Sequence, residues 1–431
     1  MRGRKKGKTI MAGQAIAVLL HGITGRMGQV AHQALNAINA AGGVKIDGQA
    51  FTTVPIGLGR DKAKLTDYAR KTGLEFFYDE IEAARDHAVQ VNHDHQVYHN
   101  LTPTGARVEV LGAVLPLLDP STTGVFCEKP VASNYAEGRE AVEMLERGRF
   151  VHGVVHDMLE TAGVRRALQL LPQIAPIHCT MVFGYEVGPG LSGNEQFRGQ
   201  RPDFNWSLSQ AGGGIILDMC HEAYVSRALF GETDRLSAVA RLIVPQRRKA
   251  GGDGVIDCEV EDYASIRREH ASGVVNNSVW TWMRRVNSEF GPLEITVEGL
   301  DGTVVFGLHG LKIQWKESAP ALHWADALKG RKIEWRDHWE SAELEPRNPF
   351  AVELARFIRC LVLREPYPYN ATVALDWLGE VEAIYQSAAR HGEPISHDRF
   401  LHYPDRVPEG WQPERLQRLF RHPGTGTGGA S

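Results

Sequence analysis

Short apolar runs alternate with segments of helical periodicity over the first part of the chain. Residues 15–20 form an apolar run, and apolar side chains then recur at three-and-four spacing, at Met27, Val30, Ala31, Ala34, Leu35 and Ile38. The run predicts a buried strand, and the spacing predicts a helix with one apolar face. Further strands are predicted at 54–58, 95–100 and 124–127, and further helices at 64–71 and 107–117. Because strands that alternate with helices form right-handed βαβ units, we expect an α/β doubly wound domain with a parallel sheet.

The pattern changes after a predicted helix at 133–147 and a predicted strand at 150–155. Several short strand-like segments then follow, some of them joined by Gly-containing turns such as 299–302, at 177–185, 236–244, 261–267, 273–283, 293–298, 303–306 and 311–315. Strands joined in this way predict a large, mostly antiparallel open sheet. Asn348 and Pro349 are a capping residue and a first-turn proline, so they predict the start of a helix, and a last helix is expected at 370–389. The overall fold class is therefore α/β followed by α+β.

The length of 431 residues exceeds that at which one hydrophobic core stops growing. We expect a basic tail at 1–13 and a dinucleotide-binding domain at 14–150, which a returning C-terminal helix completes. A substrate and oligomerisation domain at 151–400 and an extension with a flexible end at 401–431 follow. The basic start superficially resembles a signal peptide, but the apolar run continues directly into a Gly-rich turn without a cleavage site. Whether residues 1–10 are native stays open, with Met11 as an alternative start.

Composition narrows the class of partner. The formal net charge is -4, which gives no general attraction to nucleic acid or to a membrane surface. No run of eighteen apolar residues is present, so no membrane span is expected. The five cysteines form no CxxC pair, which favours reduced thiols in a cytoplasmic protein. Four histidines between residues 87 and 99 have no matched second pair of ligands nearby, so no metal site is expected.

A Gly-rich segment directly after the first predicted strand is the first candidate site. Its spacing is GxxGxxG, and we expect its residues to bind a dinucleotide: Gly22, Thr24, Gly25, Arg26, Met27 and Gly28. Glycines allow a tight turn there and let backbone amides approach a pyrophosphate at the helix N-terminus. The alternative is a plain strand-to-helix turn. The surrounding βαβ pattern favours a Rossmann-type cofactor site.

The end of the second predicted strand bears on the choice of cofactor. An acidic residue at this tip would bind the ribose hydroxyls of NAD, whereas an arginine accommodates the 2′-phosphate of NADP. Gly59 stands where the acid is expected, and Arg60 follows it. We therefore expect NADP. NAD stays possible, because Asp61 would supply the acid if the register moved by one residue.

Two further motifs carry titratable groups. Glu128-Lys129-Pro130 follows a late parallel strand, where ligands of such sheets bind, although an isolated Lys before a Pro is usually a surface residue. Pro130 restricts Lys129 to an extended backbone, and the bond between them is a candidate for the cis form. The second motif is Gly212-Gly213-Gly214 followed by Asp218, His221 and Glu222. One continuous helix would place Asp218 and His221 on the same face, where the histidine could serve as general acid or base. The alternative is a polar helix N-terminus.

These motifs together resemble the Gfo/Idh/MocA family of oxidoreductases, named after glucose-fructose oxidoreductase and inositol dehydrogenase, over residues 14–398. The resemblance implies that Lys129, Asp218 and His221 are catalytic. It also implies that Glu128, Thr102 and Pro103 lie at the cofactor. Many relatives separate the Asp and the His by three residues, whereas two intervene here, so Glu222 is the alternative if the register differs. By analogy we expect a homodimer or homotetramer formed through the C-terminal sheet.

Residues that contact the substrate are harder to assign. Asn205 and Trp206 belong to a segment that resembles part of some relatives, and they could offer a hydrogen bond and a sugar-stacking face; core packing is the alternative. His156 and Asp157 end the strand at 150–155 and are further candidates, together with Glu222.

The expected activity is an NAD(P)-dependent oxidoreduction of a secondary alcohol and a ketone on a sugar, polyol or related cyclic diol. His221 would exchange the hydroxyl proton, Lys129 would polarise the same oxygen, and Asp218 would orient its neighbours. The alternatives are a dihydrodiol dehydrogenase acting on an aromatic-derived ring diol, a non-catalytic NAD(P)-sensing regulator on the same scaffold, and a structural protein. The substrate, the position oxidised and the direction stay open.

Overall fold

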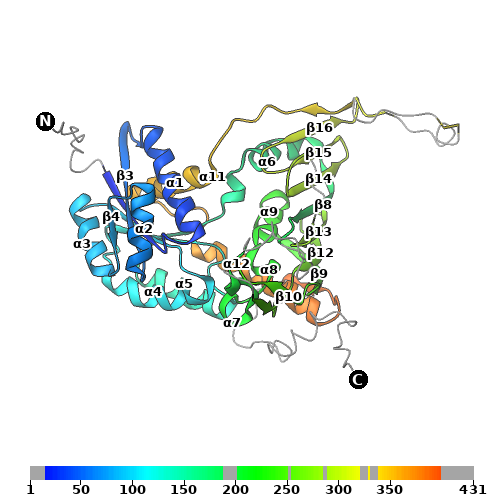
Figure 1. Cartoon of the computed structure of the whole chain (residues 1–431). Helices are drawn as coiled ribbons and strands as arrows, with labels where there is room; N and C mark the ends of the chain where they lie inside the picture. The colour runs from blue at the N-terminus through cyan, green and yellow to red at the C-terminus, as the bar shows by residue number, and fades with distance from the viewer. Residues whose placement is uncertain are drawn as a thin grey trace, which may run out of the picture. The chain divides into compact units, whose positions relative to one another are not determined.

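The computed structural model describes residues 15–187, 201–250, 254–284, 289–320, 329–330 and 338–398. The chain forms two compact units. Unit 1 consists of Met1–Ala132, Glu137–Asp157 and Asn348–Leu375, and unit 2 of Ser133–Ala136, Met158–Arg347 and Asp376–Ser431. The predicted fold class is confirmed, because one unit is built on a mostly parallel sheet and the other on a mostly antiparallel sheet (Figure 1).

The sheet of unit 1 has seven strands in the order β2-β3-β1-β5-β6-β7, with β4 paired to β3. Its strands are β1 (Ala15–His21), β2 (Val44–Ile46), β3 (Gln49–Leu58), β4 (Phe76–Tyr78), β5 (Gln96–Asn100), β6 (Thr123–Cys127) and β7 (Val151–Val154). All the pairings are parallel except β2 with β3. The β2–β3 hairpin was not predicted, because residues 49–53 mix polar and apolar side chains and do not form an apolar run.

Helices cover this sheet and complete its core. They are α1 (Arg26–Ala40), α2 (Lys62–Thr72), α3 (Ile81–Val91), α4 (Arg107–Val114), α5 (Tyr135–Arg147) and α11 (Pro349–Leu363). Helices α1 and α11 pack against each other, and both contribute to one buried apolar cluster with β1. The predicted cap is confirmed, because the Asn348 side chain accepts a hydrogen bond from the backbone N–H of Ala351 at 3.1 Å. A Cβ atom at Gly124 would lie 3.1 Å from the Phe357 ring, so a glycine in β6 lets α11 approach closely.

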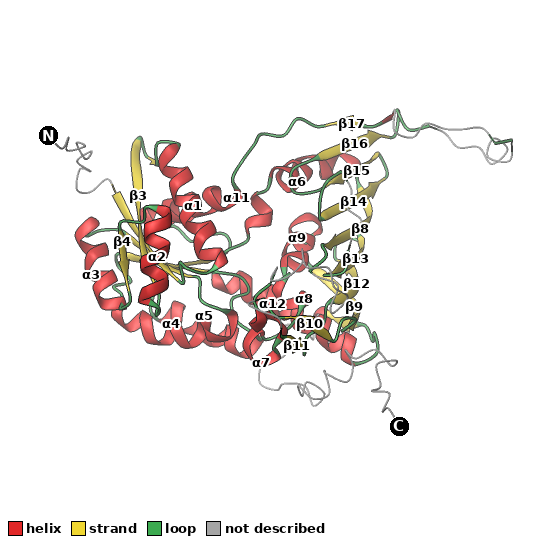
Figure 2. Cartoon of the chain, viewed as in Figure 1, coloured by secondary structure: helices red, strands yellow, loops and turns green. Residues whose placement is uncertain are grey.

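The sheet of unit 2 has nine strands in the order β17-β16-β15-β14-β8-β13-β12-β9-β18, and Figure 2 shows most of them as a row of yellow arrows. The strands are β8 (Pro176–Gly184), β9 (Thr233–Arg241), β12 (Tyr263–His270), β13 (Val275–Thr281), β14 (Leu293–Gly299), β15 (Gly302–Phe306), β16 (Leu311–Trp315), β17 (Glu340–Ser341) and β18 (Ile395–Ser396). The pair β8–β13 is parallel, and the other pairs are antiparallel. Strands β10 (Gln246–Arg248) and β11 (Val255–Asp257) form a separate ribbon.

Unit 2 has five α-helices among the described residues, namely α6 (Ala162–Ile174), α7 (Leu208–Ala211), α8 (Ile215–Asp218), α9 (His221–Phe230) and α12 (Ala371–Ala389). Of these, α6 and α8 pack directly on its sheet. The prediction that one continuous helix carries both Asp218 and His221 is wrong. Met219 has φ -104° and ψ 40°, so α8 ends at Asp218 and α9 begins at His221. The two residues therefore lie on successive short helices and not on one helix face.

The described residues contain neither a membrane-spanning helix nor a metal-binding group of side chains. No helix in this part of the chain is long and apolar enough to cross a membrane. No group of three or more His, Cys, Asp or Glu side chains among the same residues is arranged to hold a metal ion.

Candidate active site

The Gly-rich turn of unit 1 forms a tight backbone cradle. Gly22 has φ +101°, and a Cβ atom there would lie 2.8 Å from the carbonyl oxygen of Leu101. A Cβ at Gly28 would lie 2.4 Å from the carbonyl oxygen of Gly22. Gly25 caps α1 without a side-chain hydrogen bond, and the first turn of α1 has no acidic residue. The first backbone N–H groups of the helix and its positive end thus suit a bound anion, so the cradle fits a pyrophosphate.

Asp61, the acidic residue after β3 that could have bound the ribose of NAD, caps a helix in the structure. Asp61 caps α2 by accepting a hydrogen bond from the backbone N–H of Lys64 at 3.0 Å, and this bond lowers the pKa of the Asp61 carboxyl. Arg60 is exposed at the end of β3. Burial and then the Arg60 charge lower the pKa of His21, the last residue of β1, to about 4. The arginine therefore acts electrostatically at the carboxyl ends of the strands.

Lys129 lies on the turn after β6, and a buried arginine side chain fixes this turn by hydrogen bonds. The Lys129–Pro130 peptide bond is cis, as the sequence suggested. The buried Arg107 donates one hydrogen bond to the carbonyl oxygen of Pro130 and another, at 2.9 Å, to that of Thr102. Arg107 therefore joins the turn after β5 to the turn after β6. Sequence reasoning missed this residue, although an arginine at the start of an apolar helical segment was a signal for it.

The turn after β5 is fixed by a second buried side chain. Asn100 accepts hydrogen bonds from the Thr102 backbone N–H at 3.2 Å and from its hydroxyl at 2.6 Å. The amide group of Asn100 donates to the carbonyl oxygen of Arg107 at 3.3 Å. Thr102 and Pro103 thus stand on a loop that its own polar groups hold in one conformation.

Two buried titratable side chains, Glu128 and His156, interact electrostatically with Lys129. Burial raises the pKa of Glu128 to about 7, against the opposing charges of Lys129 and Arg107. Burial lowers the pKa of His156 to about 3, and its Nδ1 donates to the carbonyl oxygen of Val154 at 2.8 Å. His156, expected to contact substrate, is 2% exposed and is held inside the unit. Asp157 is partly exposed and acts electrostatically on Glu128.

In unit 2, the partner of Asp218 is an arginine that the sequence analysis did not assign. Arg201 Nη1 lies 2.5 Å from Asp218 Oδ2, and Nη2 donates to the Tyr185 hydroxyl at 2.9 Å. The guanidinium group also lies 4.3 Å from the centre of the Trp282 ring. The Arg201 side chain is 8% exposed and that of Asp218 is 26% exposed. Asp218 is thus anchored by a buried cation while its carboxylate still reaches the surface.

Trp206 and Asn205, two candidates for contacting the substrate, have different environments. Trp206 is 2% exposed, packs against Trp282 at a centroid distance of 5.1 Å and lies under the guanidinium of Arg247. This environment favours the core-packing alternative over a sugar-stacking face, because the ring is covered by protein. Asn205 lies in the same short helical turn and is partly exposed.

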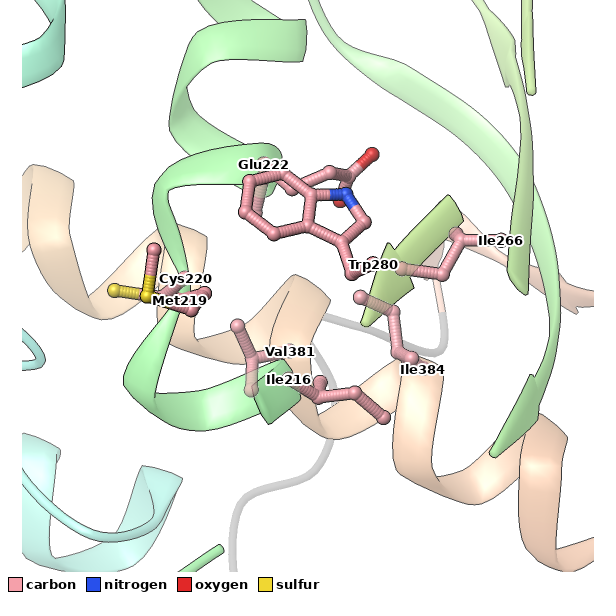
Figure 3. A pocket seen from close by; sticks show the side chains of 9 residues that line it. Ile216, Met219, Cys220, Glu222, Ile266, Trp280, Val381 and Ile384 are labelled. Atoms are coloured by element: carbon pink, nitrogen blue, oxygen red, sulfur yellow. The ribbon is translucent and has the colours of Figure 1, made fainter. Parts of the chain in front are cut away.

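His221 and Glu222 start α9 and are both buried. The His221 ring packs beside Tyr224, with ring centres 5.4 Å apart. Glu222 accepts hydrogen bonds from Arg268 and, at 2.7 Å, from the Ser278 hydroxyl. Figure 3 shows Glu222 and Trp280 on the wall of a small cavity lined mainly by apolar side chains. Glu222 therefore belongs to a buried ionic network, and the expectation that it contacts substrate is not supported.

The structure explains why a glycine is needed at the end of the Gly triplet, which the sequence did not reveal. A Cβ at Gly214 would lie 1.9 Å from the carbonyl oxygen of Glu261. The Glu261 carboxyl accepts hydrogen bonds from the backbone N–H groups of Gly214 and Ile216, at 3.0 and 2.9 Å, and from the Tyr385 hydroxyl at 2.7 Å. Burial raises the pKa of Glu261 to about 7. Glu261 thus fixes the segment that leads to Asp218 and His221.

Comparison with known proteins confirms the resemblance stated above. Residues 183–305 match the model of the GFO/IDH/MocA C-terminal domain. A curated protein named D-xylose dehydrogenase, from Paenarthrobacter nicotinovorans, is 28% identical over 362 residues, which are 80% of this chain and 88% of the relative.

Solved structures share the fold. A levoglucosan dehydrogenase in complex with NADH and levoglucosan has a TM-score of 0.69 at 18% identity, covering 89% of this chain and 99% of that one. An aldose-aldose oxidoreductase from Caulobacter crescentus complexed with glycerol has a TM-score of 0.64 at 16% identity, with coverages of 89% and 99%. At these identities the likeness establishes the architecture of the chain.

Proposed function

We propose that this chain, which carries a GFO/IDH/MocA C-terminal domain, is a nicotinamide-dependent dehydrogenase that interconverts a secondary alcohol and a carbonyl on a sugar or polyol. The observation that carries the proposal is the turn of Lys129, which stands at the carboxyl end of a parallel strand and is fixed by the buried Arg107. Ligands of such sheets bind at this edge. The curated relative named D-xylose dehydrogenase supports a sugar as the substrate class.

The residues of unit 1 would hold the cofactor. Gly22, Gly25 and Gly28 would allow the backbone to approach the pyrophosphate, which the N–H groups of Arg26 and Met27 would bind together with Thr24. The turns of Thr102-Pro103 and Glu128-Lys129 would hold the nicotinamide. When bound, the cofactor supplies the acceptor or donor of the hydride.

The residues of the chain then handle the oxygen and its proton. Lys129 donates a hydrogen bond to the substrate oxygen, and His221 takes or returns the hydroxyl proton. Asp218, held by Arg201, orients the substrate-facing groups at the junction of α8 and α9. Asn205 and Asp157 are further substrate contacts. Because these groups are positioned before the substrate arrives, most of the acceleration comes from orientation and a preformed charge environment.

NADP is the preferred cofactor in this proposal, with NAD as the alternative. Arg60 offers a planar guanidinium suited to a 2′-phosphate, while the Asp61 carboxylate is occupied as the cap of α2. NADH is present in the levoglucosan dehydrogenase complex, so both cofactors belong in any assay. We also propose that two or four copies of the chain associate through the nine-stranded sheet.

The test is a screen of sugars, polyols and cyclic diols with NADP and NAD in parallel, following the absorbance of the reduced nicotinamide. We expect turnover of a sugar or polyol, and a loss of at least about a hundredfold in Lys129→Ala and His221→Ala, the range of one general acid–base group. Lys71→Ala is the control, because Lys71 is an exposed residue of α2 paired with Asp67.

Wild-type turnover in Lys129→Ala or His221→Ala would remove that residue from the mechanism. A chain that binds neither dinucleotide in a titration would refute the proposed function. Turnover confined to aromatic-derived ring diols would replace the sugar by the dihydrodiol alternative.

A further inference from the structure

A small cavity lies inside unit 1, between the sheet and the pair of helices α1 and α11. Its volume is about 10 Å³, close to the least that one water molecule needs. Most of its wall is apolar and comes from α1, α11, β6 and the residue after β7. Three titratable side chains complete the wall, namely His99 of β5, Glu128 after β6 and Glu353 of α11. A polar cavity of this size suits one ordered water.

Buried polar atoms around this cavity have no protein partner. Both ring nitrogens of His99 and Oε2 of Glu353 make no hydrogen bond within the described part of the chain. His99 is 2% exposed and Glu353 is 1% exposed, so bulk water does not reach them. Because buried polar atoms are almost always satisfied by protein or by ordered water, these atoms require a partner that the protein does not provide.

The other oxygen of Glu353 is already engaged. Oε1 accepts hydrogen bonds from the backbone N–H of His156 at 2.6 Å and from the Tyr367 hydroxyl at 3.2 Å. A proton on the carboxyl therefore belongs on Oε2, where it can be donated into the cavity. Neutral His99 has one ring nitrogen that accepts and one that donates, so a single water can bridge Glu353 and His99.

Burial and neighbouring charges favour the protonated form of Glu353. Burial raises its pKa well above the usual range, and the neighbouring carboxylates Asp157 and Glu128 raise it further. Burial also raises the pKa of Glu128, to about 7, but the charges of Lys129 and Arg107 oppose that rise.

Further polar groups surround this carboxyl. His156 and Tyr367 both donate hydrogen bonds to it. Burial raises the pKa of Tyr367 against the opposing charge of Arg356 in α11, and burial followed by the charge of Arg107 lowers the pKa of His99 to about 3. Lys129 and Arg107 thus favour the ionised form of Glu128, whereas burial and two neighbouring carboxylates favour the neutral form of Glu353.

We propose that this cavity is a water- and proton-binding site in which Glu353 carries a proton on Oε2 and shares it, through one bound water, with His99. The neutral carboxyl prevents a third negative charge from joining Glu128 and Asp157 beneath Lys129. Glu353 is thus a positioning residue, which acts on Lys129 through the charge of the cluster. The link to Lys129 rests on the proposed function, whereas the water and the proton do not.

The test uses infrared difference spectroscopy on the resting full-length protein, without substrate or cofactor. We expect a protonated-carboxyl C=O band that persists above neutral pH, shifts in deuterium oxide and disappears in Glu353→Gln. Tyr367→Phe removes one hydrogen bond to Oε1 and keeps the carboxyl, so its band should move but remain. Glu365→Gln, an exposed residue just after α11, should leave the band unchanged.

An unchanged band in Glu353→Gln would overturn the assignment. An atomic-resolution crystal structure gives a second measurement that needs no variant. We expect a water within hydrogen-bonding distance of Oε2 and His99 and unequal C–O bond lengths in Glu353. An empty cavity or equal bond lengths would overturn the proposal.

The effect on Lys129 is read from the pH profile of turnover. Ionisation of Glu353 should slow the wild-type enzyme at alkaline pH, and Glu353→Gln, which cannot ionise, should lose that alkaline decline. A purely structural role would change the rate at every pH equally and leave the decline in place, which would sever the link to Lys129. If no substrate is turned over at all, the proposed function fails while the infrared and crystallographic results still decide the water site.

Discussion

The two units stabilise their buried carboxyl groups in different ways. In unit 2 most of them face an arginine: Asp262 pairs with Arg247, and Glu222 and Glu380 share Arg268. In unit 1 the buried Glu353 receives only backbone and hydroxyl hydrogen bonds from the described residues that contact it. A nearby cation lowers the pKa of a buried carboxyl, whereas burial by itself raises it.

One buried carboxyl of unit 2 resembles Glu353 in having no arginine partner in an ion pair within the described residues. Glu261 is the exception in unit 2, because backbone N–H groups and a tyrosine hold it in place of a cation, and its pKa rises to about 7. Glu261 and Glu128 each hold a segment that carries a proposed catalytic residue. Both segments thus include or contact a carboxyl group whose pKa is raised to about 7.

The largest expected effect comes from breaking the network of unit 2. Arg268→Met leaves Glu222 and Glu380 buried without their shared cation, so the free energy of unfolding should fall by about 3–5 kcal/mol. Urea denaturation measures this change. Arg267→Met is the control, because Arg267 is the neighbouring residue of β12 and is 52% exposed, so its loss should cost less than about 1 kcal/mol. Equal losses in the two variants would contradict the contrast between buried and exposed arginines.

The next effect is a pH dependence of stability caused by Glu261. Its pKa is raised from 4.5 to about 7 in the folded state, so the folded protein binds more protons than the unfolded chain between these values. The stabilisation is fully present below pH 4.5 and is lost as the pH rises through 7, by an amount on the order of 3 kcal/mol. Glu261→Gln should flatten this dependence relative to wild type, as measured by denaturation from pH 5 to 8. Exposed Glu109→Gln should leave the slope unchanged, and an unchanged slope in Glu261→Gln would refute the role.

A smaller loss of stability, with a large loss of activity, is expected when the clamp of unit 1 is removed. Arg107→Met deletes the hydrogen bonds to the carbonyl oxygens of Pro130 and Thr102, and bonds from a charged group are worth about 1.5–3 kcal/mol. We expect about 2 kcal/mol of destabilisation and at least tenfold slower turnover, because the turn of Lys129 is no longer fixed. Arg85→Met, on the partly exposed face of α3, is the comparison variant. Turnover at the wild-type rate in Arg107→Met would show that the turn holds itself.

The smallest effect tests the cofactor end of unit 1. Asp61→Ala removes the cap of α2 and should lower the melting temperature slightly without changing the ratio of NADP to NAD affinity. Arg60→Ala should lower NADP affinity by about tenfold and leave NAD affinity unchanged, because one charge-assisted contact to the 2′-phosphate is lost. Dinucleotide titration followed by fluorescence measures both. A change of cofactor preference in Asp61→Ala would indicate that Asp61 contacts the ribose of the cofactor.

Local features were readable from the sequence because each depends on neighbours along the chain. The strand 15–20, the helix that follows it and the Asn348 cap were predicted correctly, since apolar spacing and capping act within a few residues. The Gly-rich turn could be recognised for the same reason. The break between Asp218 and His221 could not, because Met219 leaves the helical conformation while the apolar pattern continues through it.

The tertiary structure decided which charged side chains pair with each other. Glu261 holds Gly214 from 47 residues away, and Arg268 reaches Glu380 across 112 residues. No spacing rule links such positions, because the sheet order brings them together. The sequence by itself determined the fold class, many of the helices and strands, and the motifs that contain Lys129, Asp218 and His221. Folding alone decided that Arg201, Arg107 and Glu261 hold those motifs, since the partner of a buried charge is whichever group the packing leaves beside it.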